Sequence, residues 1–265
     1  MKAITFLSKG QLDAVADYLM DHWQDVEDIM SKVEKLDLDK QVKDESFNKA
    51  KSMKGLKDAL RGAISADMAL FGRMVAQSQD LSVDAACSVA HAVSTHAVDT
   101  EYDYYTAVDD MQPDGETGAA NLGTLEFSSM TMYRYATVDV TDLAEKIGVD
   151  TVNVVAAFMH GFIMSMPSGK SHSYANFTLP DAVYVALRAD YPLSLASAFE
   201  KPVSGHDGYV ADSVIRLNEY RANLYEAYGN APVMEWQSGP VVQDGVSMAD
   251  VIAGVKEFLT DNLEV

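Results

Sequence analysis

The stretch that decides the fold is 106-TAVDDMQPDGETGAANLGTLEFSS-129. Gly, Asp, Pro, Asn and Thr are frequent in it, a composition that predicts an exposed connector. It nevertheless carries two leucines, Leu122 and Leu125, past a glycine-rich bend. Because a connector of this length inside a compact domain is usually either functional or disordered, its role decides what the protein does.

The residues before this stretch predict a helical region. Ser8 and Gln11 fit a capping box at the start of a long amphipathic helix. The apolar residues of that helix recur at helical spacing: Leu12, Val15, Leu19, Trp23, Val26, Ile29 and Val33. A charged connector around residues 35–50 leads to a second predicted helix, and a third follows it. The apolar residues of these two helices are Leu56, Leu60, Ile64 and Met68, and then Ala86, Val89, Ala90 and Val93.

The residues after the stretch predict a mixture of strands and helices. In "LEFSSMTMYRYATV", residues 125–138, the side chains alternate with a period of two, which predicts a strand with two distinct faces. Asp150 is placed to cap a helix that runs to Phe162, and "AVYVALR" at residues 182–188 predicts a further strand. Helices are expected near residues 214–228 and 247–263. A helical part followed by a mixed part indicates an α+β fold.

Length and composition set the class of protein. The chain has 265 residues, of which 48% are hydrophobic, enough to bury one or two cores. No uninterrupted apolar run reaches the ~18 residues that a membrane span requires. The first ten residues lack the apolar stretch of a secretory signal, and the single Cys87 has no partner for an internal disulfide. We therefore expect a cytoplasmic protein with no membrane partner.

The charge distribution leaves two interpretations open. The formal net charge of −20 argues against general affinity for nucleic acid, because Lys and Arg supply most of that affinity. The charge is unevenly spread, since residues 1–70 hold 11 basic and 13 acidic side chains, against 9 and 27 in the remainder. Basic residues gather on one side of the helix predicted after the charged connector, and this side is either a solvated face or a contact surface for a polyanion. Its residues are Lys49, Lys51, Lys54, Lys57 and Arg61.

Two local patterns that suggest chemistry have simpler explanations. "SGKS" at residues 168–171 resembles the end of a phosphate-binding loop, but Met164 stands where that loop requires glycine. The order of a helix before it and a strand after it is also the reverse of what such a loop needs. Asp109 and Asp110 are neighbours, a pattern typical of carboxylates that bond nearby backbone in a turn.

The histidines and the cysteine do not form a recognisable reactive group. His91 and His96 are five residues apart, whereas zinc-binding pairs on a helix prefer three or four, so structural histidines are expected. Cys87 lies in an apolar run, which is typical of a buried, unreactive thiol. Neither a G-x-S-x-G elbow nor a Cys-x-x-Cys pair occurs in the sequence. We therefore expect no catalytic residue, no cofactor and no metal site.

Tyr133 and Tyr135 fall on the same face of the strand predicted at residues 125–138. Aromatic side chains on a sheet stack on unpaired bases in many RNA-binding proteins. Aromatic residues are also enriched in strands for packing reasons alone. Both interpretations of this pair remain open.

A much longer pattern covers roughly residues 60–230 and resembles the CasC family, the backbone subunit of the type I-E CRISPR Cascade complex. The resemblance rests on Gly72-Arg73-Met74, Ser88 to His96, Thr106 to Asp110, Leu122-Gly123-Thr124, Glu126 to Ser129, Tyr133 to Ala136, Pro192 to Val203 and Asp207-Gly208. A run of this length is far more specific than a short motif. The first 60 residues are similar to the family only in their helical character.

The resemblance implies a three-part architecture. It comprises a modified RRM-like (ferredoxin-like) palm, a helical fingers domain and a protruding thumb loop. The implied ranges are fingers at 1–86, palm at 87–97 and 129–265, and thumb at 98–128. In that family, subunits polymerise along guide RNA (crRNA), and each thumb reaches over the neighbouring copy.

The resemblance also implies a function and its residues. Leu122 is expected to act as a wedge that displaces a base, because unstacking requires an apolar or aromatic surface in place of the lost stack. The supporting RNA-binding residues are Met74 of the fingers, Tyr105 and Thr106 at the thumb base, and Arg73, Arg134 and Lys170 near phosphate. The implied partners are crRNA, target DNA through the crRNA, other copies of this chain and other Cascade subunits. The sequence of the target DNA would be read by base pairing with the crRNA.

One departure from the family supports an alternative. The family's first palm strand, its Asn-Arg-Asp segment and its basic Ser-rich helix have no counterpart after Met1, and "AITFLSKGQLDAVADYL" resembles the interior of a longer relative. We expect the first palm strand to be missing, through truncation, a late start or supply by another polypeptide, which would leave neighbouring strands with unpaired backbone groups. The alternative function is a subunit-interaction module that caps or disturbs assembly without binding RNA.

Overall fold

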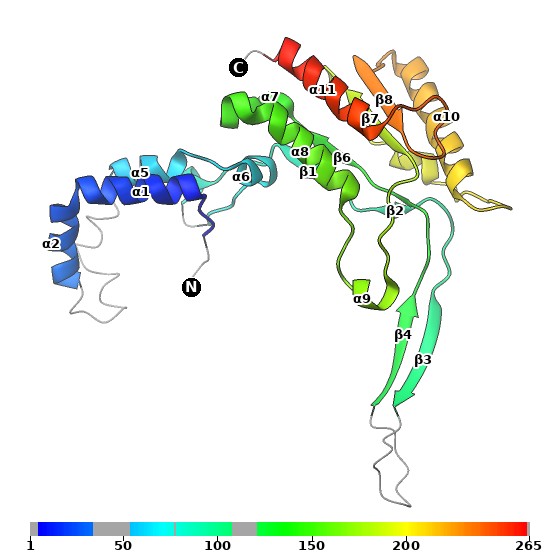
Figure 1. The fold of residues 1–265 in the computed structure, drawn as a ribbon, viewed down its shortest axis with the longest axis horizontal. Helices are drawn as coiled ribbons and strands as arrows, with labels where there is room; N and C mark the ends of the chain where they lie inside the picture. The colour runs from blue at the N-terminus through cyan, green and yellow to red at the C-terminus, as the bar shows by residue number, and fades with distance from the viewer. Residues whose placement is uncertain (1–4, 34–53, 77, 108–120, 264–265) are drawn as a thin grey trace, which may run out of the picture. The chain divides into compact units, whose positions relative to one another are not determined.

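The computed structural model describes residues 5–33, 54–76, 78–107 and 121–263 (Figure 1). The chain forms two compact units, each built from separated segments. Unit 1 comprises residues 1–88, 136–162 and 256–265, and unit 2 comprises residues 89–135 and 163–255. Helices combine with four two-stranded sheets in the described residues. The predicted α+β class is confirmed.

Unit 1 begins with the helix that the capping box predicts. Helix α1 spans Lys9–Asp21, and Ser8 Oγ accepts the Gln11 N–H at 3.0 Å while Gln11 Oε1 accepts the Ser8 N–H at 3.2 Å. The helix ends at His22, where the predicted single helix is broken, and α2 spans Trp23–Val33. The His22 ring stacks on Tyr18, and its Nδ1 lies 2.9 Å from the Tyr18 carbonyl oxygen. The His22 backbone N–H also donates to the Tyr18 carbonyl oxygen, at 3.2 Å.

The second predicted helix is also divided in two. Helix α5 spans Lys54–Arg61 and α6 spans Ala66–Phe71. Between them, Ala63 has a φ of 49°, a left-handed conformation that no helix continues through. The short 3-10 helix η1 (Gln79–Leu81) follows α6. The connector around residues 35–50 and Lys49 and Lys51 lie outside the described residues.

The third predicted helix is wrong, because residues 87–89 and 93–94 form strands. Strand β1 (Cys87–Val89) pairs with β6 (Ala136–Val138), and β2 (Val93–Ser94) pairs antiparallel with β5 (Met132–Tyr133). The apolar spacing in this segment fits a helix as well as two short strands. Backbone pairing with residues 132–138 selects the strands over the helix. A local sequence pattern does not show this pairing. The strand predicted at residues 125–138 likewise becomes the end of β4, then β5 and β6.

Two further helices complete unit 1. Helix α7 spans Val140–Ile147, with Asp139 capping the Asp142 N–H at 3.0 Å, and α8 spans Thr151–Met164. The 3-10 helix η2 (Gly148–Asp150) joins them. Asp150, which was expected to cap α8, is the last residue of this turn. The core of unit 1 is formed by Met68, Ala69, Leu70, Ala86, Cys87, Leu143, Val155 and Leu259.

The segment Val140–Met164 has the length and composition of a membrane span, with a mean hydropathy of 1.5 over its most apolar window. The absence of a long uninterrupted apolar run therefore does not exclude such a segment. It is divided by η2, in which Gly148 has a φ of 61°. Leu143 and Val155 belong to the protein's own core, and a core helix passes the same test of length and composition.

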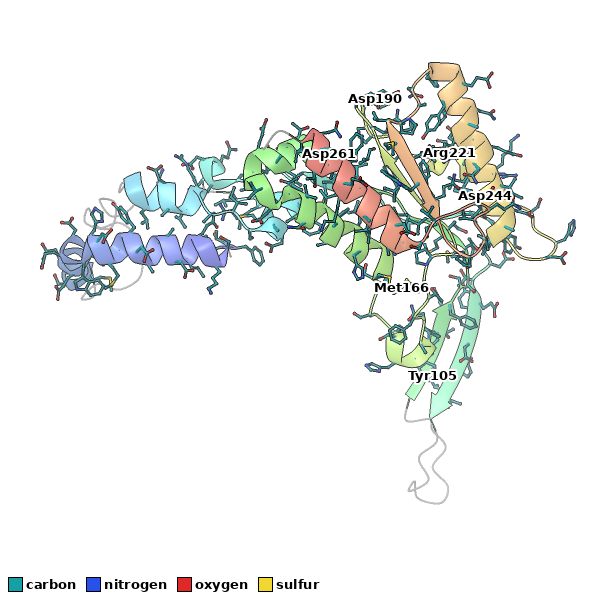
Figure 2. The ribbon with its side chains drawn as sticks, turned by 45° about the horizontal axis from the view of Figure 1, so that its top comes forward. Tyr105, Met166, Asp190, Arg221, Asp244 and Asp261 are labelled. Carbon is teal, nitrogen blue, oxygen red and sulfur yellow. The ribbon has the colours of Figure 1, made fainter. Side chains whose placement is uncertain are left out.

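Unit 2 contains the predicted strand at residues 182–188 and two predicted helices. Strand β7 (Val183–Leu187) pairs antiparallel with β8 (Met234–Ser238), and α10 spans Val210–Tyr228. Helix α11 spans Met248–Asn262, and its residues from 256 onward belong to unit 1. The 3-10 helix η3 spans Ala196–Phe199. Arg221, which Figure 2 labels on α10, has its guanidinium carbon 4.5 Å from the centre of the Tyr184 ring of β7. Gly254 of α11 faces the Trp236 indole of β8. Because Tyr184 and Trp236 point to opposite faces of the pair, a helix covers each face.

Candidate functional site

The stretch at residues 106–129 belongs to a hairpin of unit 2. Strand β3 (Glu101–Ala107) pairs antiparallel with β4 (Asn121–Phe127), from Glu101 opposite Phe127 to Ala107 opposite Asn121 (Figure 1). Both ends of the predicted connector are therefore regular strand. Asp109 and Asp110 lie outside the described residues.

The register of the hairpin sorts its side chains onto two faces, because residues directly opposite each other point to the same side. We name the two faces after their central residues. The Leu122 face consists of Tyr102, Tyr104, Thr106, Leu122, Thr124 and Glu126. The Tyr105 face consists of Glu101, Asp103, Tyr105, Gly123, Leu125 and Phe127.

The Leu122 face is exposed. Leu122 is 58% exposed, and Tyr102 and Tyr104 are 67% and 65% exposed. Thr106 lies directly opposite Leu122. Exposed apolar and aromatic side chains gathered on one surface mark a contact site, and aromatic rings offer stacking surface to bases of any sequence. The expectation that Leu122 is exposed is confirmed.

The Tyr105 face is supported by the chain itself. The Tyr105 ring lies across Gly123, where a methyl group would collide with the Tyr105 hydroxyl oxygen. The Phe127 ring centre lies 6.5 Å from that of Tyr174 in the short helix α9 (Ser171–Tyr174). Tyr105 is 39% exposed, well below Tyr102 and Tyr104. Figure 2 labels Tyr105 on the hairpin. Tyr105 and Thr106 are neighbours in one strand and therefore point to opposite faces of the hairpin.

The sequence analysis missed Tyr102 and Tyr104. The signal was present in "EYDYYTA", residues 101–107, where aromatic residues two apart occupy one face of a strand. It was overlooked because the predicted strand began only at residue 125. Pairing with β4 shows that these tyrosines share a face with Leu122.

Arg73 is committed to the interior of unit 1. It is 7% exposed, and its guanidinium donates to the Leu81 carbonyl at 2.7 Å, the Phe6 carbonyl at 3.0 Å and Gln11 Oε1 at 2.9 Å. A longer bond of 3.4 Å reaches the Leu60 carbonyl. This geometry assigns Arg73 a structural role in place of the phosphate contact expected from the sequence.

Met74, the next residue, has the opposite environment. It is 88% exposed and lies two residues after Gly72, whose φ of 77° turns the chain at the end of α6. Two open hollows of about 350 and 490 Å³ share the segment from Phe71 to Met74 as lining. Met74 is thus an exposed apolar side chain in unit 1, available to a partner.

Arg134 and Lys170 are both exposed in unit 2. Arg134 Nη1 donates to the Ser165 carbonyl at 3.2 Å. Lys170 precedes α9 with a φ of 60°.

The "SGKS" segment is followed by this short helix, not by the predicted strand, and α8 precedes it, so the rejection of a phosphate-binding loop stands.

Tyr133 and Tyr135 are packed side chains. The Tyr133 hydroxyl oxygen accepts the Leu195 N–H at 3.0 Å, and its ring centre lies 5.6 Å from that of Phe199. Burial raises the pKa of Tyr133 and raises the pKa of Tyr135 to about 12. Packing therefore accounts for this pair better than base stacking.

The basic face of α5 is largely neutralised. Arg61 Nη2 lies 2.7 Å from Asp80 Oδ2, and Lys57 Nζ lies 3.6 Å from the same oxygen. Arg61 Nη1 is also 3.6 Å from Asp58 Oδ1. This pairing favours a solvated face over a polyanion contact surface for the part of the run that the structure describes.

The remaining candidate residues have structural environments. Cys87 is buried in β1, and burial raises the pKa of its thiol, consistent with an unreactive cysteine. His91 is exposed and His96 is buried, and neither lies on a helix. The described residues contain no group of three His, Cys, Asp or Glu side chains able to hold a metal ion.

Comparison with known proteins adds to this geometry. The sequence model of the CT1975-like protein family matches residues 1–257. A solved chain described as "CRISPR RNA-guided surveillance complex, pre-nicking" is 31% identical with a TM-score of 0.68, over 79% of this chain and 59% of that one. A second, described as "CRISPR RNA-guided surveillance complex", is 26% identical with a TM-score of 0.63, over 97% of this chain and 86% of that one. This chain thus spans less than two thirds of the first structure's length. No curated protein matches it.

Proposed function

Because the chain belongs to the CT1975-like protein family, we propose that it is a non-catalytic, guide-RNA-binding backbone subunit of a type I-E CRISPR Cascade surveillance complex. It polymerises along crRNA in the cytoplasm and supports pairing with target DNA in antiviral defence. The similarity to two chains of RNA-guided surveillance complexes supports this proposal. Its partners are crRNA, target DNA through the crRNA, other copies of itself and other Cascade subunits.

The observation that carries the proposal is the exposed Leu122 face. Leu122, Tyr104 and Thr106 form a surface on a two-stranded arm, and Leu122 and Tyr104 are more than half exposed. An apolar side chain inserted between bases replaces part of the lost stacking, and a neighbouring aromatic ring receives the displaced base. In this proposal the hairpin is the thumb, within residues 98–128, residues 1–86 are the fingers, and residues 87–97 and 129–265 are the palm.

The contacts to the RNA backbone follow from exposure and charge. Lys170 and Arg134 are exposed and belong to the same unit as the hairpin, so we assign them to phosphate. Met74, which belongs to the fingers, is assigned an apolar contact with a base of the RNA. Tyr105 packs over Gly123 on the face opposite to Leu122 and acts on RNA through the shape of the thumb.

The test compares two leucines of β4. Leu122→Ser changes the Leu122 face, whereas Leu125→Ser makes the same change on the Tyr105 face. The full chain is assembled with crRNA that carries a fluorescent base analogue at successive positions. We expect periodic fluorescence from displaced bases, lost in Leu122→Ser and retained in Leu125→Ser. Equal signals from both variants, or no protection of crRNA by the parent chain from nuclease, would exclude the proposal.

A second function is favoured by the internal commitment of Arg73 and the net charge of −20. A strongly negative chain whose Arg73 is held in the interior fits a subunit-interaction module that caps or disturbs assembly without binding RNA. Mixing increasing amounts of the chain with a full-length relative and crRNA separates the two functions. A working subunit lengthens the assembled particles in electron micrographs, whereas a capping module shortens them.

A further inference from the structure

The segment that leads into β3 and the segment that leaves β4, here called the two legs of the hairpin, meet at a polar cluster in unit 2, most of it buried. We call it the root cluster, and it consists of Thr95, His96, Thr131 and Ser213. Thr95, His96 and Ser213 are 3%, 8% and 5% exposed. Buried polar groups with complete hydrogen bonding restrict a structure to one arrangement.

His96 contacts both legs through one ring. On the β3 side, its Nδ1 lies 2.7 Å from the Ala97 carbonyl oxygen. On the β4 side, its Nε2 accepts the Thr131 N–H at 3.1 Å. The imidazole therefore spans the gap between the segment that leads into β3 and the segment that leaves β4.

These contacts define the tautomer of His96. A carbonyl oxygen only accepts and a backbone N–H only donates, so Nδ1 carries the proton and Nε2 is the acceptor. Both ring nitrogens are satisfied within the protein. The ring has a defined orientation as a result.

The root cluster is also joined to α10. The His96 ring stacks on Tyr209, the N-cap residue of α10, with ring centres 3.7 Å apart and planes 11° apart. The Ser213 hydroxyl, in the first turns of α10, lies 2.8 Å from the Thr95 hydroxyl. The Thr95 N–H in turn donates to the Thr131 carbonyl at 3.0 Å. The position of the hairpin is thereby tied to a helix that packs on β7.

We infer that His96 is a positioning residue that holds the two legs of the hairpin together and aims the Leu122 face relative to α10. Hydrogen bonds to the two legs and the stack on Tyr209 converge on this one ring. The ligand of the Leu122 face rests on the proposed function. The role of His96 in fixing the orientation of that face does not depend on it. A pre-organised arm binds more tightly because less ordering remains to be done on binding.

The direct test measures the hairpin in the absence of RNA. Spin labels at Asp103→Cys in β3 and Glu219→Cys in α10, in a Cys87→Ser chain, report the distance distribution by double electron–electron resonance. Both labelled positions are exposed and lie in unit 2. We expect one narrow distribution in the parent chain and a broad one in His96→Ala. His91→Ala, which changes an exposed histidine five residues away, is the control and stays narrow.

Two conservative variants separate positioning from general stability. An asparagine amide places an N–H donor near the position of Nδ1, and a glutamine carbonyl places an acceptor near that of Nε2. We expect His96→Asn and His96→Gln each to narrow the distribution relative to His96→Ala, because each restores the contact with one leg. A narrow distribution in folded His96→Ala, or no gain from either conservative variant, overturns the inference.

A spectroscopic measurement keeps the test valid if His96→Ala does not fold. Long-range ¹H–¹⁵N correlation spectra of the parent chain distinguish the two neutral tautomers of histidine. We expect the Nδ1–H form for His96, and an Nε2–H form or a charged ring would overturn the inference.

The RNA measurement is kept separate. We expect His96→Ala to weaken crRNA binding on the order of ten-fold while leaving the bound stoichiometry unchanged, because the loss is one of pre-organisation. If the parent chain does not bind RNA but the spin-label distribution still broadens in His96→Ala, the proposed function fails and the positioning role stands. If RNA binds with equal affinity and the distribution stays narrow, the positioning role fails alone.

Discussion

The ring of Tyr105 lies across Gly123, its cross-strand neighbour in the hairpin. A Cβ at position 123 would collide with the hydroxyl oxygen of Tyr105 and would lie 2.6 Å from the ring carbon that bears it. Gly123 is also the residue that follows Leu122, on the opposite face of the strand. The pair therefore supports the exposed side of the arm from its other side.

This contact predicts the effect of a single methyl group. Gly123→Ala will displace the Tyr105 ring and weaken the hairpin by about 0.2 to 1 kcal/mol, the usual size of a cross-strand contact. Hydrogen exchange of the β3 amides will be faster as a result. Tyr105→Ala should remove most of the difference between Gly and Ala at position 123, and Tyr105→Phe should keep it. Equal effects of Gly123→Ala with and without the ring would contradict the contact.

Arg73 and Lys170 are predicted to separate stability from RNA affinity. Arg73→Ala leaves the carbonyls of Phe6 and Leu81 without their buried donor, so we expect a loss of about 3 kcal/mol in the free energy of unfolding. Lys170→Ala, at an exposed position, should change that free energy by less than about 0.5 kcal/mol. Urea denaturation measures both. In filter binding, the folded Arg73 variant should retain crRNA affinity while the Lys170 variant loses part of it, and the reverse pattern would restore Arg73 to the RNA site.

The packed, half-buried side chains of Tyr133 and Tyr135 predict a loss of stability at alkaline pH. Burial raises the pKa of Tyr135 to about 12 and also raises the pKa of Tyr133, so the folded state favours the neutral phenols. The unfolded chain ionises first, near pH 10. Stability from these groups is therefore complete below pH 10 and is lost as the pH rises toward 12. Chemical denaturation at a series of pH values should show a smaller loss in Tyr135→Phe, and an unchanged slope in that variant would contradict the assignment.

Asp80 is predicted to mask two cations on the surface of unit 1. Asp80→Asn removes the carboxylate that pairs with Arg61 and Lys57. Because exposed ion pairs contribute little to stability, the melting temperature should barely change. The freed charges should increase retention on a heparin column at low salt. Asp58→Asn, which affects Arg61 alone, is the control and should give a smaller increase. Equal retention of both variants and the parent would show that this face has no affinity for polyanions.

Local sequence patterns succeeded where the interaction that forms an element is itself local. The Ser8 and Gln11 capping box marked the start of α1, because both of its hydrogen bonds join residues three apart. The helices α10 and α11 and strand β7 followed from spacing and β-branched composition. The failure at residues 86–93 has the opposite cause, since their extended shape depends on pairing with residues more than 35 positions away.

Residue environments were harder to predict than elements. The family resemblance made Arg73 a candidate for phosphate contact, yet the residue is enclosed by backbone carbonyls of segments at Phe6, Leu60 and Leu81. No pattern near Arg73 indicates that three distant carbonyls converge on it. Tyr133 was placed correctly on a strand, but only its contact with Leu195 shows that it is packed.

The sequence by itself determined the α+β class, the family and the presence of an arm that carries Leu122, because spacing and a long family resemblance are readable without coordinates. Only the tertiary structure decided which side chains the arm presents. The register places Thr106 opposite Leu122 and turns Tyr105 to the other side, and His96 fixes both legs of the arm. The physical reason is that backbone pairing between distant segments selects the face of every residue in a strand, and a shift of one residue would reverse each choice.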